Sequence, residues 1–156
     1  AGVGGHCIAV DPYFIVSAYP EESKIIAGAR AVNNYKSEWC VEKVVNAILR
    51  FELANSRKPV VALMGLAFKP DIDDLRESPA LRIADAIVGA GTGAEILLVE
   101  PNIKDHPRYV LTDFREAFHK ADIAVMLTAH SCFRDLDKEC RHCDVLDFCG
   151  VFEGQK

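Results

Sequence analysis

The sequence predicts an α/β protein, with a Rossmann-like three-layer domain, a mostly parallel sheet, and a helical segment before it. Short apolar runs of strand length recur after residue 58, as in parallel strands that are buried on both faces. Segments with helical spacing of apolar residues alternate with these runs, and a long helical pattern precedes the first run. This β-α-β-β-α-β-α-β order is typical of helices packed on both faces of a parallel sheet.

The long helical pattern extends from about Glu21 to Ser56, as one helix or two. Pro20, followed by two glutamates, is a plausible helix start because the helix dipole favours acidic groups there. The apolar run 12–16 leads into this segment. Arg57-Lys58-Pro59 marks a boundary, so we expect two parts, residues 1–57 and residues 58–156.

In the second part, residues 58–156, the sequence predicts strands that alternate with helices. Its expected strands are 60–64, 95–99, a short 109–111, 122–127 and 144–148. Its expected helices are 79–88, 114–120 and a weak 133–140. Ser78-Pro79 opens the first of these helices with a capping residue and a proline, and Thr112-Asp113 caps the second.

Composition excludes several functional classes. The net charge is −5 with acidic and basic residues interspersed, so no nucleic-acid surface is expected. Apolar runs stay below the ~20 residues that a membrane span needs, and no signal-peptide pattern is visible. No membrane partner is therefore expected. The six cysteines are irregularly spaced, which favours reduced thiols and a cytoplasmic protein.

A zinc site is the alternative interpretation of the cysteine-rich end. The residues that suggest it are Cys140 and Cys143, with His130, Cys132, His142 and Cys149 nearby. One Cys-x₂-Cys is half of a structural zinc site, and the usual second pair at 12–20 residues is absent. Cys149 also follows an apolar run, where cysteine behaves as a small hydrophobe. The expectation is therefore that the protein holds no metal.

A glycine-rich loop opens the chain and reads Gly2-Val-Gly-Gly-His-Cys-Ile-Ala-Val-Asp11. Its glycines allow the backbone to approach a ligand closely. A nucleophilic thiol at Cys7 needs N–H donors and an acid/base group nearby, and Asp11 supplies the latter. The alternative is a tight turn before a buried cysteine. An active-site loop needs scaffold on both sides, so we expect the chain to be the carboxyl-terminal part of a longer polypeptide.

The turn between residues 65 and 79 follows the first strand of the sheet. Ligands bind at the carboxyl ends of parallel strands, and a βα connection this long is often functional. It carries Phe68 as a stacking face, Lys69 and Arg76 as phosphate partners, and a helix start at Ser78. It lacks the Gly-x-Gly-x-x-Gly dinucleotide fingerprint. The alternative is a solvated loop whose four acidic residues balance Lys69 and Arg76.

Both loops together resemble the UDP-glucose/GDP-mannose dehydrogenase family of nucleotide-sugar 6-dehydrogenases. The matching segments are 2–12, 29–33, 65–79 and 99–102. The wording His-Cys-Ile-Ala-Val-Asp-Pro is nearest to the members that oxidise UDP-N-acetyl-D-mannosamine. The resemblance weakens from about His130 onward.

The resemblance implies a reaction and a catalytic pair. The family oxidises a sugar C6 alcohol to the acid by two hydride transfers to NAD, through an aldehyde. Cys7 would capture that aldehyde as a thiohemiacetal, which becomes a thioester and is hydrolysed. Asp11 would assist proton handling or position the water. Because the family's amino-terminal NAD domain is not in the sequence, the chain alone is expected to be inactive.

The resemblance also implies binding residues and partners. Gly2 and Gly4 would offer backbone to the sugar and diphosphate, and Phe68 and Lys69 would hold the nucleotide-sugar. Arg76 would reach the NAD pyrophosphate. A homodimer formed through the long helix is the family expectation. Two alternatives stay open: a non-catalytic nucleotide-sugar-binding module, and a 6-dehydrogenase for another UDP- or GDP-sugar.

Overall fold

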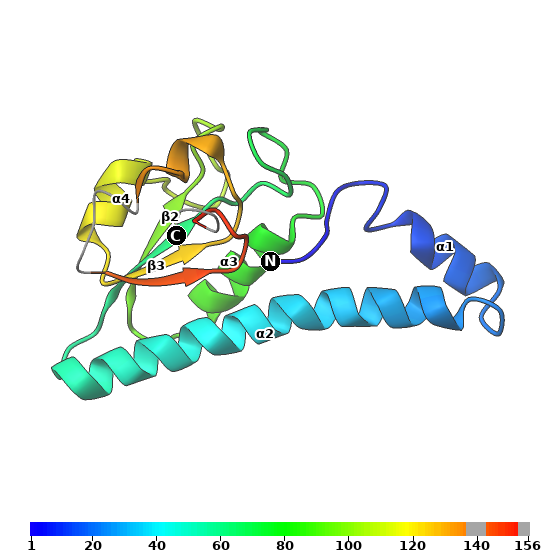
Figure 1. Cartoon of the computed structure of the whole chain (residues 1–156), viewed down its shortest axis with the longest axis horizontal. Coiled ribbons are helices and arrows are strands. Elements are labelled where there is room, and N and C mark those ends of the chain that lie inside the picture. Colours follow the sequence, from blue (N-terminus) through cyan, green and yellow to red (C-terminus); the bar gives the residue numbers. More distant parts are fainter. Residues whose placement is uncertain (137–142, 153–156) are drawn as a thin grey trace.

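The computed structural model describes residues 1–136 and 143–152, and its described part is an α/β domain with a helical arm. In chain order the elements are α1 (Asp11–Ala18), α2 (Lys24–Asn55), β1 (Val60–Met64), α3 (Pro79–Gly89), β2 (Glu95–Val99), α4 (Phe114–Lys120), β3 (Ile123–Met126), the 3-10 turn η1 (Ser131–Phe133) and β4 (Asp144–Asp147). Figure 1 shows α2 as one continuous helix that runs beneath the sheet and beyond it.

The sheet has the strand order β2-β1-β3-β4, and every pairing in it is parallel. In β1, Leu63 pairs with Leu98 on one side and with Val125 on the other. Four of the five residues of β1 are buried. The continuous apolar runs therefore formed central parallel strands, as predicted.

Helices cover both faces of the sheet and confirm the three-layer prediction. Alternate residues of β1 serve alternate faces, because side chains on a strand point to opposite sides. Val61 and Leu63 pack with the second half of α2 and with α3. Ala62 and Met64 pack with α4 and with Phe133 of η1.

Two predicted capping residues have the expected geometry. Ser78 accepts a hydrogen bond from the backbone N of Leu81, with Pro79 in the first turn of α3. Asp113 accepts from the backbone N atoms of Arg115 and Glu116 at 2.9 and 3.2 Å. These contacts satisfy amide groups that have no partner inside the helix.

Several predicted bounds were wrong. The run 12–16 forms the helix α1, which has a proline in its first turn and buries no residue, so no helical stripe of apolar residues marks it. Helix α2 begins at Lys24 rather than near Glu21, because Tyr19–Ser23 form the turn after α1. The segment 109–111 makes only an isolated bridge, between Leu111 and Leu98. Of the weak helix predicted over 133–140, residues 137–140 lie outside the described residues, and Phe133 belongs to η1.

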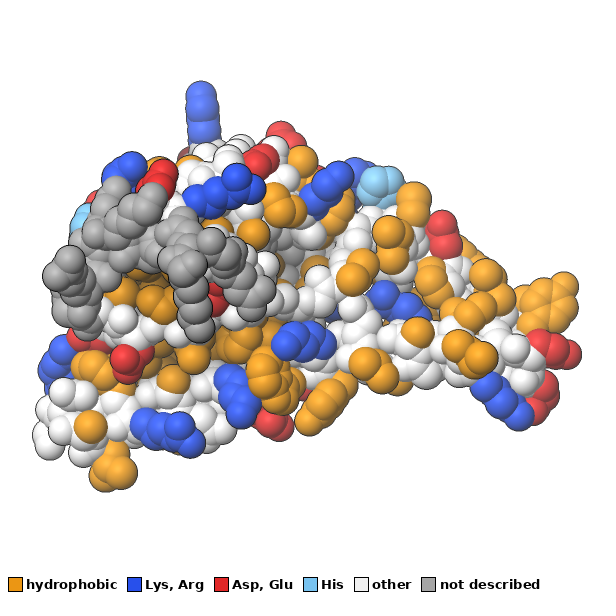
Figure 2. Space-filling view, viewed as in Figure 1, with side chains coloured by type: hydrophobic (Ala, Val, Ile, Leu, Met, Phe, Trp, Pro, Cys, Tyr) orange, Lys and Arg blue, Asp and Glu red, His pale blue; other side chains and the backbone are white. Residues whose placement is uncertain are grey.

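Helix α1 and the first half of α2 form an arm that extends away from the sheet (Figure 1). Hydrophobic side chains gather on this arm in Figure 2. The exposed ones include Phe14 and Tyr19 near the tip, and Ile25 and Val32 on α2. Among the described helices none is long and apolar enough to cross a membrane.

Candidate functional site

The glycine-rich loop and the 65–79 turn pack directly against each other. The backbone N of Gly5 donates to the carbonyl O of Glu77 at 3.4 Å. A Cβ on Gly4 would lie 2.4 Å from that same oxygen and 2.4 Å from Cδ of Pro79. A Cβ on Gly5 would lie 3.0 Å from the ring of Phe68. The glycines are therefore required because the two backbones meet without room for a side chain.

Helix α2 holds the start of the glycine-rich loop. The side-chain amide of Asn33 donates to the carbonyl O of Val3 at 3.0 Å and accepts from the backbone N of Val3 at 2.7 Å. We call this pair of bonds the Val3–Asn33 clamp. It joins the loop to the first half of α2, so the loop is held by this helix on one side and by the 65–79 turn on the other.

Cys7 and Asp11 lie on the outer side of the loop. The carbonyl O of Cys7 accepts from the backbone N atoms of Val10 and Asp11 at 3.0 and 2.8 Å, which makes a tight turn into α1. Cys7 is exposed, so the alternative of a buried cysteine is wrong. Asp11 is exposed in the first turn of α1.

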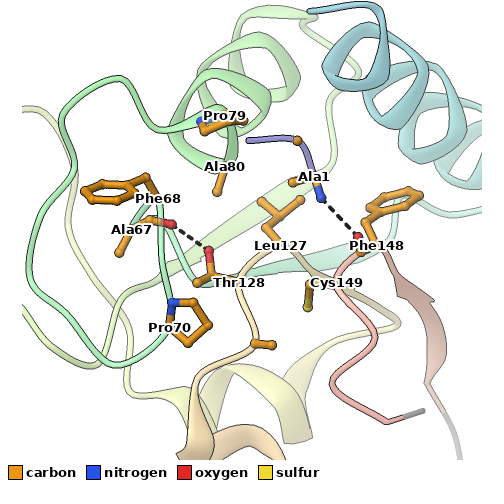
Figure 3. Close-up of a pocket in the computed structure, with 12 residues that line it drawn as sticks. Ala1, Ala67, Phe68, Pro70, Pro79, Ala80, Leu127, Thr128, Phe148 and Cys149 are labelled. Atoms are coloured by element: carbon orange, nitrogen blue, oxygen red, sulfur yellow. Dashed lines mark hydrogen bonds between the residues drawn. The ribbon is translucent and has the colours of Figure 1, made fainter. Parts of the chain in front are cut away.

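A cavity of about 320 Å³ lies at the carboxyl ends of β1, β3 and β4, beside the glycine-rich loop (Figure 3). Its walls come from residues 1–2, 67, 68, 70, 79–80, 127–129 and 148–149. Figure 3 shows Phe68 and Pro70 on the side of the turn, and Ala1 beside Phe148 on the opposite side. The position agrees with the rule that ligands bind at the carboxyl ends of parallel strands.

The predicted binding residues are distributed unequally around this cavity. Gly2 and Phe68 line it, and Gly4 is buried in the contact behind it. Lys69 and Arg76 are exposed and lie outside its wall, as do Cys7 and Asp11. The structure therefore gathers all seven predicted site residues on the two packed loops, but only two of them face the cavity.

Arg76 is engaged within its own turn. Its Nε donates to Oδ1 of Asp74 at 3.0 Å and its Nη2 donates to Oδ2 at 2.7 Å. The Arg76 guanidinium beside Asp74 lowers the pKa of that carboxyl to about 2. For this pair the internally balanced loop, which was the alternative interpretation, is correct. The arginine side chain remains 67% exposed, so it can still contact a ligand at its outer surface.

Two buried polar side chains behind the turn were missed as site residues. The sequence pattern assigned no role to Glu100, and His130 was considered only for zinc. Glu100 Oε2 accepts from the backbone N atoms of Leu66 and Ala67 at 2.8 and 2.9 Å, and it lies 3.1 Å from Nε2 of His130. Burial would raise the pKa of Glu100, but the bonds from His130 and from these amides bring it below its usual value. Both residues follow a predicted strand, which was the available signal.

The described residues contain no group of three His, Cys, Asp or Glu side chains that could hold a metal ion. Cys140 and His142, which belong to the zinc alternative, lie outside the described residues. His130 is committed to the contacts of the turn. Burial, with the carboxylate of Asp147 nearby, raises the pKa of Cys149 to about 12 and disfavours the thiolate that zinc requires.

The turn after β1 lacks the set of glycines with which a Gly-rich fingerprint binds a dinucleotide. Gly65 is its one glycine, with a φ of +88°, and a Cβ there would lie 2.7 Å from Cβ of Thr128. This glycine therefore serves close packing against the end of β3 and not the approach of a pyrophosphate.

The parallel sheet, with helices on both faces and a cavity at the carboxyl ends of its strands, defines a Rossmann-like α/β domain. The sequence model "UDP-glucose/GDP-mannose dehydrogenase family, UDP binding domain" matches residues 62–153, which is more than half of the chain. The chain therefore belongs to the UDP-glucose/GDP-mannose dehydrogenase family, as the resemblance predicted.

Individual relatives agree with this membership. The chain is 46% identical over 142 residues to an NDP-N-acetyl-D-galactosaminuronic acid dehydrogenase of Ralstonia nicotianae, covering 88% of this chain and 32% of the relative. It is 43% identical over 160 residues to the UDP-N-acetyl-D-mannosamine dehydrogenase of Escherichia coli, covering 97% and 38%. The solved structure of a UDP-D-ManNAc dehydrogenase from Pyrococcus horikoshii aligns with a TM-score of 0.77 at 28% identity, covering 98% and 36%. The chain spans about a third of the length of these relatives.

Proposed function

We propose that the chain binds a nucleotide-sugar and forms part of an NAD-dependent nucleotide-sugar 6-dehydrogenase. The observation that carries this proposal is the contact of Gly4 with Glu77 and Pro79, which brings the loop of Cys7 against the 65–79 turn. The family's UDP-binding domain matches the part of the chain that holds this turn.

The nucleotide-sugar would occupy the 320 Å³ cavity and extend over the glycine-rich loop. Phe68 lines the cavity and offers an apolar face to the nucleotide. Lys69 follows it in the exposed turn and would pair with the diphosphate. Gly2 lines the cavity and would present its backbone to the sugar and diphosphate, and Gly4, buried against Glu77 and Pro79, would serve the same ligand by letting the loop lie close to the turn.

Cys7 would act as the nucleophile on the exposed side of the same loop. Its Sγ would add to the carbonyl carbon of the C6 aldehyde, whose oxygen takes up a proton. After the second oxidation a water would displace Sγ from the acyl carbon, which releases the acid and restores the thiol. Asp11 would handle the proton or position this water. Two molecules of NAD, bound one after the other, would each accept one hydride, and Arg76 would pair with the NAD pyrophosphate.

The proposed substrate is UDP-N-acetyl-D-mannosamine, supported by the wording of the cysteine loop and by the names of several relatives. Another UDP- or GDP-sugar is the alternative, because the relative from Ralstonia nicotianae is named for a galactosaminuronic acid. The chain by itself would be a binding module, because it spans about a third of its relatives and the matched family model describes a UDP-binding domain.

We also propose that the protein is a cytoplasmic homodimer. The exposed apolar side chains of the arm support the dimer, since apolar surface patches mark protein interfaces. Val32→Glu would place a charge in that surface, and sedimentation should then show a monomer. The division into residues 1–57 and 58–156 is part of the same proposal, and the family model begins close to it, at residue 62.

Two measurements test the proposed function. UDP binding to the 156-residue chain is measured by calorimetry. Phe68→Ala should weaken UDP binding about tenfold, whereas Phe14→Ala, the same truncation on the arm, should leave it unchanged.

In the complete gene product, about two NADH should form per UDP-N-acetyl-D-mannosamine oxidised. Cys7→Ala should abolish acid formation, and Cys132→Ala, at another exposed cysteine, should not. Acid formation at the normal rate without Cys7 would refute the mechanism.

A further inference from the structure

The turn that leaves β1 is flanked by residues from the ends of both neighbouring strands. Because β1 lies between β2 and β3, the carboxyl ends of these strands stand on either side of the turn. Glu100 directly follows β2, and His130 follows β3 by four residues. Their exposed fractions are 3% and 0%. Neither residue lines the cavity, so any effect on a ligand there would pass through the turn.

Glu100 anchors the beginning of the turn. One carboxylate oxygen accepts from the backbone N atoms of Leu66 and Ala67, the two residues before Phe68. The other oxygen accepts from the backbone N of Asn102 at 3.1 Å and from its side-chain amide at 3.3 Å. A carboxylate can accept several bonds at once, so all these donors are satisfied by one buried group.

His130 anchors the turn on the far side of Phe68 and Lys69. Its Nδ1 accepts from the backbone N of Asp71 at 2.9 Å and lies 3.0 Å from the side-chain amide N of Asn102. Because Nδ1 is an acceptor, the ring hydrogen is on Nε2, which donates to Glu100 at 3.1 Å. The two anchors are therefore joined to each other by one hydrogen bond.

Asp71 shows why the second anchor matters. Its φ is +59°, a left-handed conformation that is costly for a residue with a side chain unless its surroundings hold it. The His130 bond holds its backbone N, and Ser131 donates to its carboxylate from the backbone N at 2.8 Å and from Oγ at 2.9 Å. Without the acceptor at His130, Asp71 can relax and the segment 68–69 loses one of its ends.

We propose that Glu100 and His130 are positioning residues for the nucleotide-sugar site: together they fix the segment that carries Phe68 and Lys69 against the glycine-rich loop. This inference rests on the proposed function. It is carried by the placement of bonds on both sides of that segment, at Leu66 and Ala67 and at Asp71. The Glu100–His130 bond couples the two ends.

Two substitutions at His130 separate positioning from general stability. The side-chain oxygen of asparagine can take the place of Nδ1, so His130→Asn keeps the acceptor for Asp71 and loses the donor to Glu100. The side-chain amide of glutamine can take the place of Nε2, so His130→Gln keeps that donor and loses the acceptor. His130→Asn loses the bond to Glu100, and His130→Gln loses the bond from Asp71 together with the contact to the Asn102 amide, so the urea unfolding midpoint should fall in both variants.

The test uses the whole 156-residue chain, with UDP as the probe in calorimetry and solvent-exchange NMR on the amide of Asp71. His130→Gln should exchange this amide about tenfold faster than wild type and bind UDP about tenfold more weakly. His130→Asn should stay within about threefold of wild type in both measurements. The amide of Glu95, which bonds to the carbonyl O of Pro59 at the amino ends of β1 and β2, is the internal control.

The outcomes distinguish this inference from the proposed function. If both variants weaken UDP binding equally while the Asp71 amide exchanges at the wild-type rate, or if both bind UDP as wild type does, the positioning role is refuted. If wild type itself fails to bind UDP, the proposed function fails. The exchange rates then decide separately whether His130 holds the turn.

Discussion

Substituting Gly4 tests the contact between the glycine-rich loop and the 65–79 turn. A Cβ on Gly4 would lie 2.4 Å from the carbonyl O of Glu77 and 2.4 Å from Cδ of Pro79, about 1 Å short of ordinary van der Waals contact. Neither neighbour is the end of a flexible side chain, since one is backbone and the other a proline ring that opens α3. Gly4→Ala must therefore move the two loops apart by about 1 Å.

The expected loss follows from the cost of overpacking a close contact. Such insertions cost about 1–3 kcal/mol, which at a urea slope of ~2 kcal/mol per M lowers the unfolding midpoint by about 1 M. Trp39 is the single tryptophan, and its ring packs edge-on against Phe148 at 5.7 Å, so its fluorescence reports unfolding of the domain. UDP binding should weaken in the same variant, because Pro79 and Phe68 line the cavity.

Gly28→Ala is the matched control. Gly28 lies in α2, where a Cβ would meet no atom within 4 Å, and an alanine in a helix is favoured over glycine by about 0.5–1 kcal/mol. The same chemical change should therefore leave stability equal or higher there. If Gly4→Ala unfolds at the wild-type urea concentration and binds UDP equally well, the close packing of the two loops is wrong.

Three further predictions concern single side chains. Asp113→Ala removes the cap of α4 and should lower the free energy of unfolding by about 1 kcal/mol in urea titration, while an unchanged midpoint would contradict the cap. The pKa of Glu100 is lowered on folding from its usual 4.5, so its contribution to stability is present above that pH and is lost as pH falls below it. The stability gap between wild type and Glu100→Gln should therefore narrow below pH 4.5, and a gap that widens there would refute this sign. The half-buried Cys149 thiol, with its pKa of about 12, should be alkylated by iodoacetamide at pH 8 at least tenfold more slowly than the exposed Cys7, as measured by peptide mass spectrometry.

The sheet was predictable because burial on both faces leaves a direct trace in the sequence. The run Val60–Met64 is apolar at every position and became the central β1. Helix α1 was not predictable in this way, since it buries no residue and so shows no helical stripe. Caps were readable at Ser78 and Asp113, because their chemistry depends on neighbouring amides alone.

The site was predicted in its parts more than in its connections. Glycine spacing and the long turn located the two loops, and the structure brings them into contact. The pairing of Arg76 with Asp74 was left open, because charges of both signs crowd the turn and only its fold selects partners. The contact of Glu100 with His130 joins residues thirty positions apart, and it depends on the strand order β2-β1-β3. No local pattern encodes that order.

The Val3–Asn33 clamp closes residues 3–33 into a loop that leaves the domain after Gly4 and Gly5, which pack on the 65–79 turn, and returns to it along α2. The turn after α1 and the tip of the arm lie beyond these contacts and extend away from the sheet (Figure 1). Insertions or deletions in residues 19–23 should then alter the arm's outline while the ladder from β2 to β4 keeps its register. The arm can therefore vary in sequence and length while the α/β domain keeps its fold.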